Sequence, residues 1–243
     1  MTVADYLAYY LNERGVKRVF EVTGGMITFL LDAIHRNGRI QIVSLHHEQS
    51  AAMAADVYGR LTGVPGVALA TSGPGAINLL TGIAGAYFDS SPTVFITGQV
   101  NRNEQRGQRK IRQQGFQETD IVSMARPVTK AAWIVMEASS FPSLLEDAFA
   151  LATEGQPGPV LLDIPMDIQT AELSQDLYPQ VEHRLKEPSP TLPVDAIRSA
   201  ASILAKAQHP LIIAGGGIRA ANAAPLFRSW VERIKVPVVH SLM

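Results

Sequence analysis

The residues best suited to chemistry are His46, His47 and Glu48, which stand where an apolar segment meets an alanine-rich one. Residues 40–45, IQIVSL, indicate a buried strand, and the run that begins at Glu48 indicates a helix. The helix dipole favours a glutamate in the first turn, so Glu48 has a structural explanation. It also has a chemical one, because a carboxylate beside an alanine wall can share a proton with a ligand nitrogen.

A second candidate is the stretch TSGPGAIN, residues 71–78. Gly-Pro-Gly is a common turn, and a purely structural role accounts for it. The alternative is that the glycines let a ligand approach the backbone at the start of a helix. The stretch lacks the lysine of a phosphate-binding P-loop, so we do not interpret it as one.

The elements that must position these residues alternate between apolar strands and helix-like segments. This pattern predicts an α/β fold, with an open parallel sheet covered by helices on both faces. Ligands of such sheets bind beyond the carboxyl ends of the strands. Residues 23–25, 46–48 and 71–78, together with the polar segment 99–120, follow four successive strands. We therefore expect them to line one pocket.

The alternation stops in a proline-containing stretch of mixed charge. We expect a first domain over residues 1–170, a linker over 171–190 and a second, Rossmann-like α/β domain that starts at 191. Residues 191–243 offer two strands and two long helices, too few to close a core. The second domain is therefore expected to be incomplete, and the chain to be part of a longer protein.

Composition narrows the class of protein. Among the 243 residues, 47% are hydrophobic and 18% charged, the net charge is −1, and there is no cysteine. These values predict a cytoplasmic globular protein that binds neither nucleic acid nor membrane, and they exclude a disulfide scaffold. We expect no metal site within the chain, because no His, Asp or Glu cluster has ligand spacing.

Four segments together resemble a known family: residues 46–63, 66–100, 115–122 and 155–169. They are similar to the N-terminal, pyrimidine-binding domain of thiamine diphosphate-dependent enzymes, and most similar to the acetolactate synthase-like group. The resemblance covers about residues 2–170, and the remainder resembles the start of the central domain of that family.

The resemblance implies a role for individual residues. Glu48 is the catalytic glutamate that hydrogen-bonds N1′ of the cofactor's aminopyrimidine. The cofactor-binding positions that it implies are Gly24, Thr71, Pro74 and Asn78. The substrate-side positions are Phe116, Gln117, Lys130 and His47. His47 has the alternative role of a hydrogen-bonded residue that orients its loop.

The sequence also departs from the family pattern. His46 stands where acetolactate synthases usually have arginine, and EVTGG, residues 21–25, replaces the usual YPGG. Glu21 and Thr23 therefore leave the substrate open. The segment after residue 100 is unusually basic; it is either a solvated loop or a means of attracting an anionic substrate.

The resemblance implies decarboxylation of a 2-oxo acid and transfer of the two-carbon unit to a carbonyl acceptor. Lyase or hydrolase chemistry on the same cofactor, and a non-catalytic half that binds a partner, are alternatives. GGGIRA, residues 215–220, also fits a dinucleotide motif but lacks the acidic residue that such a site needs.

The expected cofactors are thiamine diphosphate and Mg²⁺, the metal being held by a missing C-terminal domain, with FAD as an option in the central domain. We expect a homodimer or homotetramer with a two-fold interface on the helices at 49–61 and 76–88. The chain alone should be inactive.

Overall fold

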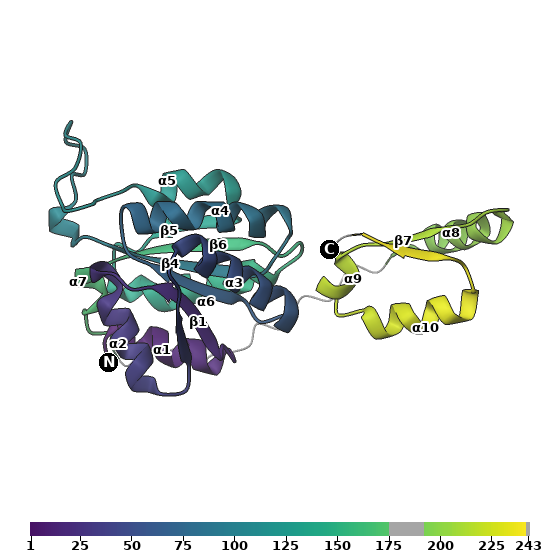
Figure 1. The fold of residues 1–243 in the computed structure, drawn as a ribbon, viewed down its shortest axis with the longest axis horizontal. Coiled ribbons are helices and arrows are strands. Elements are labelled where there is room, and N and C mark those ends of the chain that lie inside the picture. The colour runs from purple at the N-terminus through teal and green to yellow at the C-terminus, as the bar shows by residue number, and fades with distance from the viewer. Residues whose placement is uncertain (175–191, 242–243) are drawn as a thin grey trace. The chain divides into compact units, whose positions relative to one another are not determined.

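The computed structural model describes residues 1–174 and 192–241, which fall into two compact units, Met1–Arg184 and Leu185–Met243 (Figure 1). The start of the predicted linker belongs to the first unit. The amide of Val3 donates to the carbonyl of Ala171, and the amide of Leu173 donates to that of Met1, both at 3.0 Å. The predicted linker residues from 175 onward lie outside the described residues.

The first unit is built on a six-stranded, fully parallel sheet of order β2-β1-β3-β4-β6-β5. The strands are β1 (Arg18–Val22), β2 (Gln41–Ser44), β3 (Gly66–Ala70), β4 (Thr93–Gln99), β5 (Ala131–Ile134) and β6 (Pro159–Pro165). The strands β3, β4 and β6 are buried along their whole length, as expected of parallel strands covered on both faces. The predicted α/β fold is therefore confirmed.

Helices cover both faces of this sheet (Figure 1). One face packs against α1 (Val3–Glu13), α2 (Thr28–Asn37) and α6 (Phe141–Thr153). The other packs against α3 (Glu48–Thr62), α4 (Pro74–Phe88) and α5 (Ile121–Ala125). Because side chains alternate along a strand, Val19 of β1 joins the first cluster and Phe20 the second.

Helix boundaries follow local sequence signals. Thr2 caps α1 in a capping box with Asp5. Gly38 and Gly63 end α2 and α3 in the left-handed conformation, at φ of 69° and 73°. The short helices α5 and α7 (Met166–Gln169) were not expected, because one turn of helix gives no clear periodic pattern.

The second unit contains α8 (Val194–Lys206), β7 (Ile212–Ala214), α9 (Gly217–Ala220), α10 (Ala224–Ile234) and β8 (Val238–His240). Its two strands pair in parallel, as in a Rossmann-like βαβ unit. None of its described residues is buried. This agrees with the expectation that these elements do not close a core of their own.

Candidate active site

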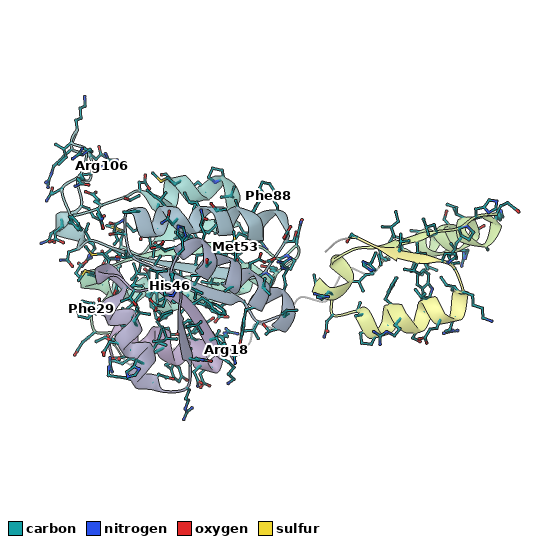
Figure 2. The ribbon with its side chains drawn as sticks, in the orientation of Figure 1. Arg18, Phe29, His46, Met53, Phe88 and Arg106 are labelled. Atoms are coloured by element: carbon teal, nitrogen blue, oxygen red, sulfur yellow. The ribbon has the colours of Figure 1, made fainter. Side chains whose placement is uncertain are left out.

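The loops that follow the first four strands lie along one edge of the sheet. The strands β2, β1, β3 and β4 are consecutive neighbours and run in parallel, so their carboxyl ends are adjacent. Figure 2 shows the labelled His46 in the loop between β2 and α3. The four polar loops that were predicted to line a pocket therefore lie next to one another along this edge.

Close packing of α3 on α4 sets the position of Glu48. A Cβ atom on Gly82 of α4 would lie 2.3 Å from Cβ of Ala52 on α3, so only glycine permits this approach. Ala51, Ala52 and Ala55 are fully buried on this side of α3. The small residues thus bring the two helices together and place Glu48, the first residue of α3, beside the first turn of α4.

The carboxylate of Glu48 is half-buried and held on one side only. Asn78 Nδ2 donates to Glu48 Oε2 at 2.9 Å. In the described part of the chain, Oε1 accepts no hydrogen bond and Glu48 forms no ion pair. One oxygen is therefore fixed while the other remains available to a donor on a ligand.

The two histidines before Glu48 are exposed. His47 is the N-cap of α3, and its Nδ1 accepts from the amide of Gln49 at 3.1 Å. This geometry favours the loop-orienting role over a substrate contact for His47. The ring that caps the helix also fixes the backbone immediately before Glu48.

The SGPG turn brings Thr71 close to Glu48. Gly73 has φ of 64°, and Pro74 occupies the first turn of α4, where its missing N–H is tolerated. A Cβ atom on Gly75 would lie 2.8 Å from Cγ2 of Thr71 and 3.3 Å from Oε1 of Glu48. The turn therefore keeps the space beside Glu48 free of side chains.

The loop after β1 contacts the same threonine. A Cβ atom on Gly24 would lie 2.4 Å from Cβ of Thr71, and the amide of Met26 donates to Thr71 Oγ1 at 3.2 Å. A Cβ atom on Gly25 would meet nothing within 4 Å. The structure thus brings together one cluster, the Glu48 cluster, made of Gly24, Thr71, Pro74, Asn78 and Glu48. The roles of these residues toward a cofactor stay predictions.

The end of the polar segment 99–120 packs over this turn. Gln117 adopts φ of 58°, and a Cβ atom on Gly73 would lie 2.7 Å from Cβ of Gln117. Phe116 beside it is 72% exposed, so its ring has no packing partner that would bury it in this unit. Gln117 lies next to the cluster, and Phe116 presents an apolar surface to solvent.

Lys130 is not brought to this cluster. It precedes β5, and its Nζ donates to the carbonyls of Glu154 and Gln156 at 2.6 and 2.9 Å. These groups precede β6, at the amino edge of the sheet, opposite the edge that carries Glu48. Within residues 1–174, no hydrogen bond or ion pair joins the Lys130 ammonium to Glu48, and the substrate-side role of Lys130 stays a prediction.

A buried network beside the site was missed from the sequence. Asp163 of β6 is 1% exposed; its carboxylate accepts from Thr97 Oγ1 at 2.7 Å and from Gln99 Nε2 at 2.9 Å. Burial raises the pKa of Asp163 to about 7, the Asp120 charge adds to this, and the two hydrogen bonds oppose it. A lone aspartate within the apolar run VLLDIP is the signal that could have revealed it.

The basic part of the segment 99–120 has two environments. Arg102 is paired with Asp167, with Nε 2.7 Å from Oδ2. Arg106, which Figure 2 labels, and Arg112 contribute to the wall of a cavity of about 570 Å³ that Gln99 and Asp163 also line.

The described residues lack two other kinds of feature. They contain no group of three or more His, Cys, Asp or Glu that could hold a metal ion. Nor do they contain a helix both long and apolar enough to span a membrane.

The residues of the cluster fit an aminopyrimidine. Such a ring offers a nitrogen to a carboxylate, and Glu48 Oε1 makes no hydrogen bond within the described residues. Gly75 leaves backbone, and no side chain, beside this oxygen. The helix that Glu48 begins buries three alanines, Ala51, Ala52 and Ala55, in the core on this side of the sheet.

The fold is that of a thiamine pyrophosphate enzyme; thiamine pyrophosphate is a synonym of thiamine diphosphate. The N-terminal TPP binding domain of these enzymes matches residues 1–124, and their central domain matches residues 197–243. The chain therefore belongs to the thiamine pyrophosphate enzymes, as the sequence motifs indicate.

Among similar proteins, the acetolactate synthase isozyme 2 large subunit of Escherichia coli is 40% identical over 245 residues, which cover 100% of this chain and 42% of that protein. The acetolactate synthase large subunit of Lactococcus lactis is 37% identical, over 96% of this chain and 40% of that protein. That of Corynebacterium glutamicum is 39% identical, over 100% and 38%. The chain spans about two fifths of the length of these relatives.

Proposed function

We propose that this chain is the N-terminal part of an acetolactate synthase-like enzyme. The full-length protein would decarboxylate a 2-oxo acid and transfer the two-carbon unit to a carbonyl acceptor. The similarity to acetolactate synthase large subunits supports this choice of reaction over lyase or hydrolase chemistry on the same cofactor.

The observation that carries the proposal is the state of the Glu48 carboxylate. Asn78 holds one of its oxygens at 2.9 Å, and no cation of the described residues neutralises it. A carboxylate fixed in this way against buried alanines can exchange a proton with a ring nitrogen without being displaced. Glu48 is therefore the acid–base group of the proposed site.

The other residues of the cluster bind and orient. Gly24, Thr71 and Pro74 form the surface on which the pyrimidine half of the cofactor would rest, and Asn78 keeps Glu48 in place. When bound, thiamine diphosphate supplies the carbon atom that takes up the acyl unit of the substrate. Once the cofactor and a second copy of the chain cover this region, the apolar helix walls would exclude water from it, which protects a reactive carbon centre from premature protonation.

The remaining cofactors are assigned by the same resemblance. Mg²⁺ would bind with the diphosphate through residues outside this chain. In the second unit, FAD or no nucleotide would accompany the βαβ pair of β7 and β8. Neither assignment depends on the geometry of the Glu48 cluster.

We further assign the outer surfaces of α3 and α4 to a contact with a second copy of the chain. Met53, Val57 and Leu61 are spaced four residues apart on α3, form one stripe, and are 48%, 45% and 71% exposed. Phe88 at the end of α4 is 73% exposed, and Figure 2 labels it together with Met53. Contiguous exposed apolar residues of this kind mark protein–protein contacts. An isologous contact would place two Glu48 residues near one interface.

The direct test uses the full-length protein with thiamine diphosphate, Mg²⁺ and pyruvate as the probe 2-oxo acid. We expect release of carbon dioxide together with a condensed 2-hydroxy-3-oxo acid, and neither when the cofactor is omitted. Cofactor binding without decarboxylation of any short 2-oxo acid would favour the lyase or hydrolase alternative. Failure to bind the cofactor would refute the proposal.

A further inference from the structure

A second carboxylate near the site, that of Glu21, has no role in the proposed function. It lies in β1 and is only 1% exposed. Glutamate is almost never fully buried without a charged partner. In the described part of the chain, Glu21 forms no ion pair. An apolar side chain here would avoid the desolvation cost, so stability alone does not explain a glutamate.

The partners of Glu21 are two hydroxyl groups. Thr23 Oγ1 donates to Glu21 Oε2 at 2.9 Å, and Ser44 of β2 donates to Oε1. Hydrogen bonds to a charged group are stronger than those between neutral groups. The carboxylate thus joins the end of β2 to the first residue of the loop that follows β1.

That loop is fixed at its other end as well. Gln169 Nε2 donates to the carbonyl of Met26 at 2.8 Å, and a Cβ atom on Gly98 would lie 1.9 Å from the same oxygen. The amide of Met26 donates to Thr71 Oγ1. Residues 23–26 are therefore held at their start by Glu21 and at their end by Gln169 and Thr71.

Glu21 and Glu48 lie on different sides of the sheet. Side chains alternate along β1, so Glu21 points to the face that α1 and α2 cover, with Val19. Glu48 begins α3, which covers the other face. The loop after β1 connects Glu21 to the cluster through the contact of Gly24 with Thr71.

We propose that Glu21 is a positioning residue, whose carboxylate holds the Thr23 hydroxyl and so fixes residues 23–26 against Thr71. This inference rests on the proposed function, because the surface made by Gly24 and Thr71 is the one assigned to the pyrimidine. A loop fixed before the cofactor arrives loses no conformational entropy on binding, so the hydrogen bond contributes to cofactor affinity.

The test compares three variants of the full-length protein. Thr23→Val keeps the β-branched shape and removes only the hydroxyl, whereas Thr23→Ser keeps the hydroxyl. Thr62→Val is the matched control, since it removes a threonine hydroxyl that donates to the carbonyl of Tyr58 at 2.8 Å, far from this loop. Amide hydrogen exchange of residues 23–27 and the dissociation constant of thiamine diphosphate are measured for each.

For Thr23→Val we expect exchange of the Met26 amide to be about tenfold faster and the cofactor to bind about tenfold more weakly, as for the loss of one hydrogen bond to a charged group. Thr23→Ser and Thr62→Val should match the unaltered protein in both. Exchange in α6 should stay unchanged in all of them, which separates a loosened loop from general destabilisation.

Unchanged exchange at Met26 in Thr23→Val would overturn the proposal, as would equal effects of Thr23→Val and Thr23→Ser. Glu21→Leu provides a second approach, with the same faster exchange expected in the loop. If the unaltered protein did not bind thiamine diphosphate, the proposed function would fail, and the exchange data would still decide whether Glu21 fixes the loop.

Discussion

Replacing Asp163 by asparagine should remove a pH dependence of stability that this one buried carboxyl group creates. The side chain lies between Thr97 and Gln99, and burial raises its pKa to about 7. The asparagine side chain has nearly the same shape and does not titrate. The difference in unfolding free energy between the two proteins therefore isolates the titration of Asp163 from that of other carboxyl groups.

The sign follows from proton uptake. Below about pH 4 the carboxyl group is protonated in both folded and unfolded chains. Between about pH 4 and pH 7 the folded protein retains a proton that the unfolded chain has released, so the unfolding free energy falls as the pH rises. A pKa raised by about three pH units corresponds to about 4 kcal/mol in total, and the loss is complete above about pH 8.

Asparagine adds a term that does not depend on pH. The orientation of the Gln99 amide is fixed, because its Oε1 accepts from the amide of Val100 and its Nε2 donates to the carbonyl of Thr119. The new amide at position 163 would therefore turn its oxygen toward Gln99 and its Nδ2 toward Thr97, whose hydroxyl would lose the acceptor for its own proton, at a cost of about 1–3 kcal/mol.

Urea denaturation of the 243-residue chain and its Asp163→Asn variant, at several pH values between 4.5 and 8, measures both terms. The unaltered chain should be the more stable by the largest margin at pH 4.5, and this margin should shrink steadily toward pH 8. A margin that is constant over this range, or one that widens with pH, would refute the raised pKa and the reasoning from burial.

Two further changes test other parts of the structure. Gly75→Ala should weaken thiamine diphosphate binding by about tenfold or more in the full-length protein, because the new methyl group would contact Thr71 and Glu48. Gly85→Ala, on the same helix and with open space at the new atom, should bind normally; equal affinities would count against the pyrimidine surface. Val57→Glu should convert a dimer of the 243-residue chain to a monomer in sedimentation at micromolar concentration, because it places a charge in the apolar stripe of α3. Phe29→Glu on α2 is the control, and dissociation by that variant alone would place the interface elsewhere.

The sequence was sufficient for the features that depend on local pattern. Uninterrupted apolar runs predicted the strands, and Gly38 and Gly63 marked the ends of helices that the structure shows there. The gathering of four loops at the carboxyl edge followed from strand direction alone. Alanine and glycine on α3 and α4 led us to expect an interface between two copies, which stays a prediction; within one chain the same residues let Ala52 and Gly82 approach each other.

Features that depend on strand order could not be obtained in this way. The strand β4 pairs with β6, and β5 lies outside both, so chain order does not reveal that Thr97 and Gln99 meet Asp163. Lys130 lies at the amino edge because it precedes a parallel strand, but its contacts with Glu154 and Gln156 depend on the pairing of β5 with β6. Histidine is an unusual N-cap, so the hydrogen bond of His47 to Gln49 had no clear sequence signal.

The central claim is that Glu48 exchanges a proton with the bound cofactor. The most direct measurement is the rate at which the C2 proton of bound thiamine diphosphate exchanges with D₂O, in the full-length protein and in its Glu48→Gln variant. Glutamine keeps the size of the side chain and the contact with Asn78, so the cofactor should remain bound. We expect exchange in the variant to be slower by a factor of about 10² to 10⁴, as for the removal of an acid–base group. Exchange at the unaltered rate, with the cofactor bound, would contradict the assignment of Glu48.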